Sequence, residues 1–412
     1  MTTKPTYNHI PALRFPEFQN DGEWKQLKFN DAFSFLQNNT LSRSELNYKT
    51  GIAQNIHYGD VLIKYGECVD VKKDVLPFIT EDAVAQKYQH AKLQNGDVVI
   101  ADTAEDEIVG KCSEVIGMTD EFVVSGLHTM PIRPQIPFAQ PFLGYYLNSE
   151  SYRNQLRPLM QGVKVTSLSK SAISKTTIVC PKSIEEQRKI ASCLSFLAEM
   201  IAATKEKLEL LKAYKRGLMQ KLFPAQGKTL PEYRFKEFEK DGEWEVKKLG
   251  DCLQYEQPQP YLVASENYSS KGTPVLTAGK TFVLGFTTED FGIFEDVPVI
   301  IFDDFTTDSK YVDFPFKAKS SAMKMLHAKE GHNLKFLFET MQTIDFKPMD
   351  HQRHWISIYS NFVIATPSYN EQCKIALCFS SIDVAINACA SKIVSLQEFK
   401  KGLMQQMFPT SK

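Results

Sequence analysis

A pair of acidic residues is the first feature of this sequence that could carry chemistry. Asp303 and Asp304 directly follow the apolar run 298–302, which is typical of a buried strand. Acidic pairs at strand ends bind metal ions in nucleases, but no downstream Glu-x-Lys element completes a nuclease triad with these two. We therefore expect Asp303 and Asp304 to cap a turn, or to face a lysine or a DNA base.

Two other short patterns point to ligand binding but are incomplete. A phosphate-binding loop ending at 279–281 needs a glycine five residues before its last glycine, where the sequence has Pro274. His351 and His354 have a spacing that could hold a metal, yet no cysteine or carboxylate lies at ligand spacing. Serine-hydrolase, dinucleotide-binding and adenine-methyltransferase motifs are also missing from the sequence. It therefore predicts no catalytic residue and no metal ligand.

Basic, hydroxyl and aromatic residues gather in several expected loops, and they form the candidate DNA-binding set. Lysines there would contact phosphates, whereas Arg353, Ser320 and Ser321 could reach base edges. The alternative for each residue is ordinary solvated surface. The candidate set is Lys164, Ser167, Lys170, Lys280, Thr281, Lys317, Lys319, Ser320, Ser321, Lys324, Arg353, His354 and Trp355.

The composition is that of an ordinary globular protein with room for two or three domains. The chain has 412 residues, of which 43% are hydrophobic and 24% charged, and its net charge is −1. A positive surface for nucleic acid must therefore be local or shared with a partner. The start lacks the apolar core of a signal peptide, no run approaches a membrane span, and the eight cysteines are scattered. We expect a reduced, cytoplasmic protein without a membrane segment.

A duplicated helical segment organises the whole chain. The run 186–224 recurs 185 residues later as 371–409, and both copies begin with Glu-Gln-x-Lys-Ile-Ala and end in Gly-Leu-Met-Gln-x-x-Phe-Pro. Apolar residues at alternating spacings of three and four predict two long helices that pair along a coiled-coil seam. The predicted helix-pairing residues are Ile190, Leu194, Leu197, Ile201, Leu208, Leu211 and Leu218 in the first copy, and Ile375, Phe379, Ile382, Ile386, Ile393, Leu396 and Leu403 in the second.

A second, shorter repeat occurs before each of the two dissimilar regions of the chain. The pattern Arg-Phe-x-Glu-Phe-x-x-Asp-Gly-Glu-Trp begins at Arg14 and again at Arg234, 220 residues later. We call these segments the first and second box. The chain therefore divides into a first globular region (1–184), a central helix (185–226), a second globular region (227–370) and a C-terminal helix (371–412).

Both globular regions are expected to be mixed α/β with many short strands. The apolar runs 61–65, 97–102 and 298–303 predict strands, and 138–160 and 333–341 predict helices. Ser183 followed by Glu186 predicts a capping box at the start of the first long helix.

These residues together resemble a known family, the DNA-specificity subunits of type I restriction–modification systems. The resemblance rests on the duplicated helix, the two boxes and the two dissimilar regions between them, and it covers essentially the whole chain. It implies two α/β target-recognition domains, each reading half of a bipartite, asymmetric site in double-stranded DNA. Two long antiparallel coiled-coil helices would separate these domains and give the chain an internal pseudo-twofold repeat.

The resemblance also implies partners rather than chemistry of its own. The subunit would be non-catalytic and hold no cofactor. It would recruit two copies of an adenine methyltransferase subunit that uses S-adenosylmethionine, and restriction subunits that use ATP and Mg²⁺. The second region further resembles a branch of these domains that reads a GAA-type half-site. The alternative hypothesis is a coiled-coil scaffold between two protein-binding domains, without a role on DNA.

Overall fold

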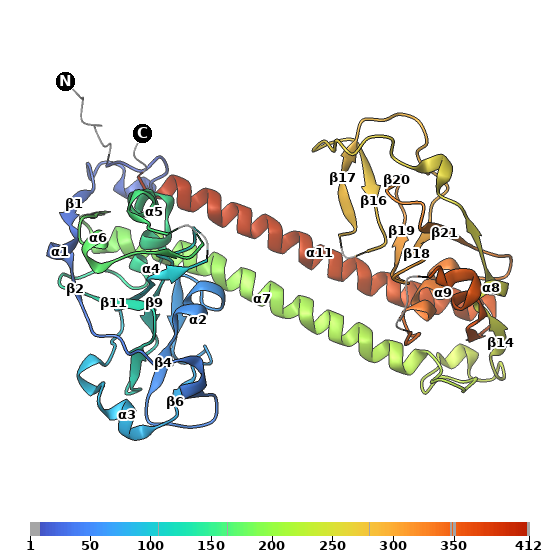
Figure 1. Ribbon diagram of the computed structural model, residues 1–412, viewed down its shortest axis with the longest axis horizontal. Helices are drawn as coiled ribbons and strands as arrows, with labels where there is room; N and C mark the ends of the chain where they lie inside the picture. The colour runs from blue at the N-terminus through green and yellow to red at the C-terminus, as the bar shows by residue number, and fades with distance from the viewer. Residues whose placement is uncertain are drawn as a thin grey trace. The chain divides into compact units, whose positions relative to one another are not determined.

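The chain forms two compact units that share both long helices. The computed structural model describes residues 9–409, except 106, 163, 280, 347 and 349–351. Unit 1 comprises residues 1–204 and 392–412, and unit 2 comprises residues 205–391. The long helices α7 (Ile184–Leu222) and α11 (Tyr369–Met407), green and red in Figure 1, each contribute one part to each unit. Pro224 and Pro409 lie just beyond the helix ends, as the sequence predicts.

Unit 1 is built on a mixed five-stranded sheet and a smaller four-stranded sheet. The larger sheet has the order β2 (Phe33–Phe35), β11 (Thr129–Pro134), β7 (Val98–Ala101), β9 (Cys112–Ile116) and β5 (Cys68–Asp70). The smaller sheet has the order β10 (Val123–Ser125), β4 (Gln54–Ile56), β6 (Phe78–Ile79) and β3 (Leu46–Asn47). Two ribbons join β1 (Lys25–Lys28) to β13 (Thr177–Cys180) and β8 (Thr103–Ala104) to β12 (Thr166–Ser167).

Unit 2 has a related but shorter set of strands. Its four-stranded sheet has the order β15 (Leu253–Glu256), β21 (Met323–Ala328), β18 (Val299–Asp303) and β19 (Ser309–Val312). A three-stranded sheet has the order β17 (Val283–Thr287), β16 (Thr273–Leu276) and β20 (Lys317–Ala318). The ribbon of β14 (Glu245–Lys248) and β22 (Val363–Thr366) corresponds to the ribbon of β1 and β13.

Most of the expected elements form where the sequence places them. The predicted helix at 138–160 appears as α4 (Phe142–Asn148) and α5 (Glu150–Leu156), and α9 (Leu334–Met341) starts at its cap Asn333. The predicted strand at 61–65 is wrong, because this run belongs to helix α2 (Tyr58–Ile63). The His57 side chain accepts a hydrogen bond from the Gly59 amide and caps that helix, a signal that a short apolar run does not contain.

Every residue predicted to pair the two long helices is buried or half-buried. In unit 1, Leu194 near the start of α7 shares a core with Met407 at the end of α11. In unit 2, Leu222 at the end of α7 shares a core with Ile375 near the start of α11. Within each unit, the two helices therefore run in opposite directions.

The repeated Phe-Pro ends of the helices complete the cores of the two units. Phe408 packs edge-on against Trp24 of the first box, with ring centroids 6.3 Å apart. Phe223 lies in the core that contains Trp244 of the second box. The Leu13 amide also donates to the Gln406 carbonyl at 2.9 Å, and Tyr233 makes the same bond to Lys221. Each box is therefore joined to the end of a long helix.

Each box is also clamped to the start of the other long helix in its unit by a buried ion pair. Arg14 Nε and Nη2 donate to the two carboxylate oxygens of Glu186 at 2.7 and 2.8 Å. Arg234 makes the equivalent pair with Glu371 at 2.8 and 2.7 Å, and both glutamates are only 1% exposed. The Ser183 hydroxyl accepts a hydrogen bond from the Glu186 amide at 3.4 Å, which is half of the predicted capping box. The Glu186 side chain does not complete this cap, because it binds Arg14.

The lysine near the end of each helical repeat fixes the globular part of its unit. Lys215 Nζ contacts Glu339 of α9 at 3.0 Å and Asp383 of α11 at 2.8 Å in unit 2. Lys400 Nζ contacts Glu67 at 2.7 Å in unit 1. Both lysines are mostly buried, and their partners Glu339 and Glu67 belong to the dissimilar regions, so the same repeated residue contacts two different domains.

Helix α11 requires one correction to the sequence analysis. It contains an 18-residue window with a mean hydropathy of 1.5, which by length and composition alone is enough to cross a membrane. One such helix is weak grounds for a membrane span. The side chains of Ile375, Phe379 and Met407 are buried in the cores of the two units, and 28% of the apolar window is buried.

Removing one member of a box clamp should destabilise its unit. We expect Arg234→Ala to lower the free energy of unfolding of unit 2 by about 3–5 kcal/mol, because it leaves the Glu371 carboxylate buried without its partner. Chemical denaturation followed by hydrogen exchange in β14 and β22 measures the effect. The double variant Arg234→Ala/Glu371→Leu should lose less than the sum of the single losses, and strict additivity would contradict a direct clamp.

A buried carboxyl group in unit 1 predicts a pH-dependent stability. Burial raises the pKa of Glu114 on β9 from 4.5 to about 8, although its Oε2 accepts from the Gly144 amide at 2.8 Å. The unfolded chain loses this proton near pH 4.5 and the folded chain near pH 8, so wild-type stability falls between these values. The change in the free energy of unfolding caused by Glu114→Gln should therefore be more favourable at pH 8 than at pH 4.5, by on the order of 3 kcal/mol.

Hydrogen exchange in the sheet of β7 and β9 measures this difference at the two pH values. Lys111→Gln, immediately before β9, is the control for a general effect of removing a charge. An equal change at pH 4.5 and pH 8 for Glu114→Gln would contradict the assignment.

Candidate nucleic-acid interface

An aspartate at the end of a central strand holds two loops together in each unit. In unit 1, the Asp102 amide donates to the His128 carbonyl at 3.1 Å, and the Asp102 carbonyl accepts from the Leu168 amide at 2.8 Å. In unit 2, Asp304 makes the same two bonds, to the Ala322 carbonyl at 3.0 Å and from the His354 amide at 2.9 Å. We call this pair of backbone hydrogen bonds, made by one aspartate, an aspartate bracket. Asp102 follows β7 and Asp304 follows β18, so the two brackets occupy equivalent places in the two sheets.

This equivalence defines one loop edge in each unit. The first edge consists of the segments around Thr103, His128 and Ser167, and the second of those around Phe305, Ser321 and Arg353. We call them reading edge 1 and reading edge 2. The backbone bonds are the same in both, whereas the side chains at matching positions differ in chemistry. Such an arrangement can present two different recognition surfaces on one constant frame.

Reading edge 1 carries an exposed polar cluster. His128 is 48% exposed, and its Nδ1 lies 3.3 Å from Asp102 Oδ1, to which Thr103 Oγ1 donates at 2.8 Å. The Tyr58 ring packs edge-on against His128, with centroids 5.3 Å apart. His128 has a φ of 53°, an uncommon conformation for a residue other than glycine and one that often marks functional loops. Ser167 pairs with Thr103 in the ribbon of β8 and β12.

Reading edge 2 is held by the acidic pair that the sequence singled out. Asp303 Oδ1 accepts from the Phe305 and Thr306 amides at 2.9 and 2.8 Å and so caps a turn. Asp304 Oδ2 lies 3.1 Å from Lys324 Nζ, so the expected turn cap and lysine partner are both confirmed. Phe305 remains 37% exposed beyond this turn, and Thr307 has a φ of 61°. Arg353 is exposed immediately before α10 (His354–Ser357).

Four of the predicted DNA contacts have side chains that are buried inside unit 2. Lys317 is 0% exposed and its Nζ lies 2.7 Å from Glu289 Oε2, and Lys324 is 2% exposed beside Asp304. His354 and Trp355 are 1% and 2% exposed. The sequence favours exposed positions for these residues, because local composition does not show whether a lysine is buried beside an acidic partner.

The other predicted contacts are half-buried, exposed or outside the described residues. Lys319 is half-buried and pairs with Glu266, and Ser320 is half-buried with its hydroxyl accepting from the Ala322 amide at 3.1 Å. Lys280 lies outside the described residues. The exposed members are Lys164, Ser167 and Lys170 in unit 1, and Thr281, Ser321 and Arg353 in unit 2. Of these, Ser167, Ser321 and Arg353 lie on the two reading edges.

Thr103, His128 and Phe305 were not among the contacts predicted from the sequence. One signal for them was present, because both edges begin where an aspartate ends a buried apolar strand, at Asp102 and at Asp304. Of these two aspartates, only Asp304 was a candidate from the sequence. The backbone bonds that bring the distant loops together depend on tertiary structure and have no local signature.

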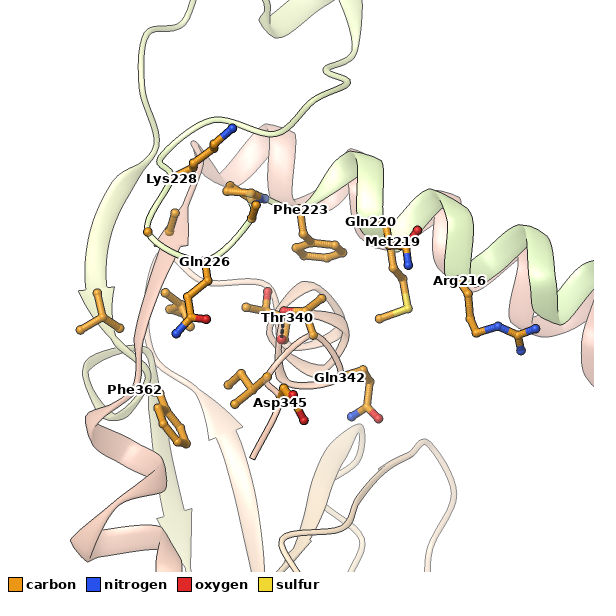
Figure 2. Close-up of a pocket in the computed structure, with 18 residues that line it drawn as sticks. Arg216, Met219, Gln220, Phe223, Gln226, Lys228, Thr340, Gln342, Asp345 and Phe362 are labelled. Atoms are coloured by element: carbon orange, nitrogen blue, oxygen red, sulfur yellow. Dashed lines mark hydrogen bonds between the residues drawn. The ribbon is translucent and has the colours of Figure 1, made fainter. Parts of the chain in front are cut away.

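Unit 2 also contains a cavity away from these loops, at the end of α7. It has a volume of about 630 Å³ and is lined by the last turns of α7, the linker to the second box, the segment after α9 and β22. Figure 2 shows Met219 and Phe223 of α7 and Gln226 of the linker around this space. Asp345 is a lone acidic residue in its lining, so the residues present do not form an acid–base pair for catalysis.

Comparison with known proteins identifies relatives of this chain. Residues 22–213 match the family model described as the type I restriction modification DNA specificity domain. The Escherichia coli type I restriction enzyme EcoR124I/EcoR124II specificity subunit is 51% identical over 126 residues, or 29% of this chain and 31% of that protein. The putative type I restriction enzyme MjaX specificity subunit of Methanocaldococcus jannaschii is 24% identical over 265 residues, or 61% of this chain and 58% of that protein. The chain thus spans less than two thirds of the length of either relative.

Two solved structures share the fold over nearly the whole chain. The type I restriction–modification S subunit from M. genitalium matches with a TM-score of 0.63 and 13% identity, over 98% of this chain and 100% of that one. A structure concerned with assembly and conformational transition of the type I R-M system matches with a TM-score of 0.51 and 13% identity, over 94% and 98%. Residues 22–213 therefore match a type I restriction modification DNA specificity domain, and the chain shares the fold of these two solved structures.

Proposed function

We propose that this chain is a non-catalytic subunit that reads a bipartite, asymmetric site in double-stranded DNA. Each reading edge contacts one half of the site. The observation that carries the proposal is the repeated aspartate bracket, which holds equivalent loops with different side chains in the two units. Two different surfaces on the same frame suit an asymmetric site, because each surface selects its own base sequence.

The long helices would set the distance between the two half-sites. Each helix contains 39 residues, which corresponds to roughly 58 Å at 1.5 Å per residue. A stiff spacer of fixed length selects half-sites at one separation along the duplex. The number of base pairs between the two half-sites would then matter for binding, whereas their sequence would not.

The proposed partners follow from the family and from the duplication. Two equivalent sets of box, helix start and helix end suit two copies of one adenine methyltransferase subunit, which uses S-adenosylmethionine. Restriction subunits that use ATP and Mg²⁺ would join the same complex in the cytoplasm. For the second unit we propose a GAA-type half-site, because its sequence from Glu256 to Met325 resembles the branch of recognition domains that reads such sites.

Substitutions at the two reading edges should alter different halves of the recognised site. We expect Arg353→Ala to weaken binding of cognate DNA by about 1–3 kcal/mol and to relax specificity only in the second half-site. His128→Ala should relax specificity only in the first half-site. Mapping of methylated adenines after expression with the methyltransferase subunit measures both effects. Lys240→Ala, an exposed change in the second box, is the control and should leave the motif unchanged.

A change in the wrong half-site for either variant would contradict the assignment of edges to half-sites. Binding titrations at low and moderate salt separate this function from the scaffold alternative. A DNA-reading subunit loses affinity steeply as salt rises, because phosphate contacts release counterions. A scaffold without a role on DNA would bind no duplex at either salt concentration.

A further inference from the structure

The carboxylate of the aspartate bracket has a different role in each unit, although the backbone bonds are the same. In unit 2, Asp304 is 1% exposed and its Oδ1 accepts from the Trp355 amide at 2.8 Å. In unit 1, the Asp102 side chain is 26% exposed, and its Oδ1 faces Thr103 and His128 on reading edge 1. The Asp102 carboxylate can therefore orient a side chain on the reading edge, whereas that of Asp304 is enclosed.

The surroundings of His128 determine which of its ring nitrogens carries the proton. In a neutral imidazole, one nitrogen is a donor and the other an acceptor. His128 Nδ1 lies 3.3 Å from Asp102 Oδ1 and 3.4 Å from Thr103 Oγ1. The ionised carboxylate can only accept, and Thr103 donates its single hydroxyl proton to Asp102 Oδ1 at 2.8 Å. Both neighbours of Nδ1 are therefore acceptors, and Nδ1 carries the proton.

The other ring nitrogen, Nε2, is left as an acceptor on an exposed side chain. His128 is 48% exposed, and no group among the described residues donates to its Nε2. The ring is also held in place, because Tyr58 packs edge-on against it with centroids 5.3 Å apart and itself packs against His57 at 4.6 Å. An acceptor with a fixed position and a fixed protonation state can select a donor on a ligand.

The edges of the DNA bases differ in the groups that such an acceptor can distinguish. In the major groove, adenine and cytosine present an exocyclic amino group, whereas guanine and thymine present a carbonyl oxygen. The lone pair on Nε2 attracts the amino group and repels the oxygen. Inverting a base pair exchanges one group for the other, so this acceptor distinguishes the two orientations of a pair.

We propose that His128 Nε2 accepts a hydrogen bond from the amino group of one adenine or cytosine in the first half-site. Asp102 and Thr103 are positioning residues that keep this nitrogen unprotonated. The inference rests on the proposed function, and it names the chemical group that reading edge 1 recognises. Unit 2 has Ala322 at the position of His128 and Phe305 at that of Thr103, so reading edge 2 recognises its half-site without this contact.

A double-mutant cycle between protein and DNA tests the contact. The full chain, bound to its methyltransferase subunit, is titrated with duplexes of the methylated motif in which one base of the first half-site is changed. Deoxynebularine replaces adenine and deoxyzebularine replaces cytosine, and each lacks only the amino group. Analogues of guanine and thymine without the major-groove carbonyl oxygen complete the set. At one adenine or cytosine, loss of the amino group should weaken wild-type binding about five- to tenfold, but should not weaken binding by His128→Ala further.

Two further variants separate the contact from damage to the loop. His128→Asn should behave like His128→Ala, because asparagine tolerates the positive φ at this position and its short amide does not replace Nε2. His90→Ala is the matched control, an exposed histidine outside both reading edges, and should keep the wild-type pattern. Each analogue changes the free duplex equally for every protein, so the cycle isolates the direct contact.

The positioning role has a separate readout. Nitrogen NMR of the histidine-labelled chain should show His128 protonated at Nδ1 and unprotonated at Nε2. Asp102→Asn keeps the backbone bonds of the bracket but removes the carboxylate, so it should give a mixture of the two tautomers and reduce the coupling to the amino group. Thr103→Ser keeps the hydroxyl and should preserve both the tautomer and the coupling, whereas Thr103→Val should reduce both.

Equal losses for the wild type and His128→Ala at every position, with specific binding of the motif intact, would overturn the inference and leave the proposed function standing. Coupling to a guanine or thymine, or a ring protonated at Nε2, would also overturn it, because the ring would then donate. A wild-type complex that binds the motif no better than an unrelated duplex would overturn the proposed function and the inference together.

Discussion

The pair of buried arginine–glutamate clamps is the interaction on which the rest of the structure depends. Arg14 with Glu186 and Arg234 with Glu371 join each box to the start of a long helix. The same helix start also holds the globular part, since Gln187 Oε1 accepts from the Ala139 amide and Gln372 Oε1 from the Asn333 amide. A charged pair is directional and costly to break when buried, so it fixes the angle at which the chain enters and leaves each domain.

Constant and variable residues have separate roles in this design. The repeated residues form clamps, seams and helix ends, and they hold each unit in the same way. The dissimilar regions share the backbone bonds at the brackets of Asp102 and Asp304, where side chains are free to differ. Recognition can therefore change without disturbing the frame. The lysines Lys215 and Lys400 show the same principle, because each anchors a different set of partners from one repeated position.

The repeats could be predicted from sequence because they consist of periodic apolar residues and of motifs that recur within the chain at a fixed spacing. The helices and their seam followed from that periodicity, and the turn at Asp303 followed from its residue type. The candidate site was harder to predict. Lys317 and Lys324 are buried with acidic partners far away in sequence, and no local pattern distinguishes them from exposed lysines. His128 and Thr103 reach their positions through backbone bonds between distant loops, which local sequence does not encode.

The most direct test of this account is an exchange of the second globular region. Residues 252–370 would be replaced by the corresponding region of another specificity subunit with a known half-site, and methylated adenines would then be mapped. The account predicts a motif in which the second half changes to that of the donor, while the first half and the spacer length stay the same. A motif altered in both halves, or one that keeps its original second half, would contradict the assignment of one half-site to each unit.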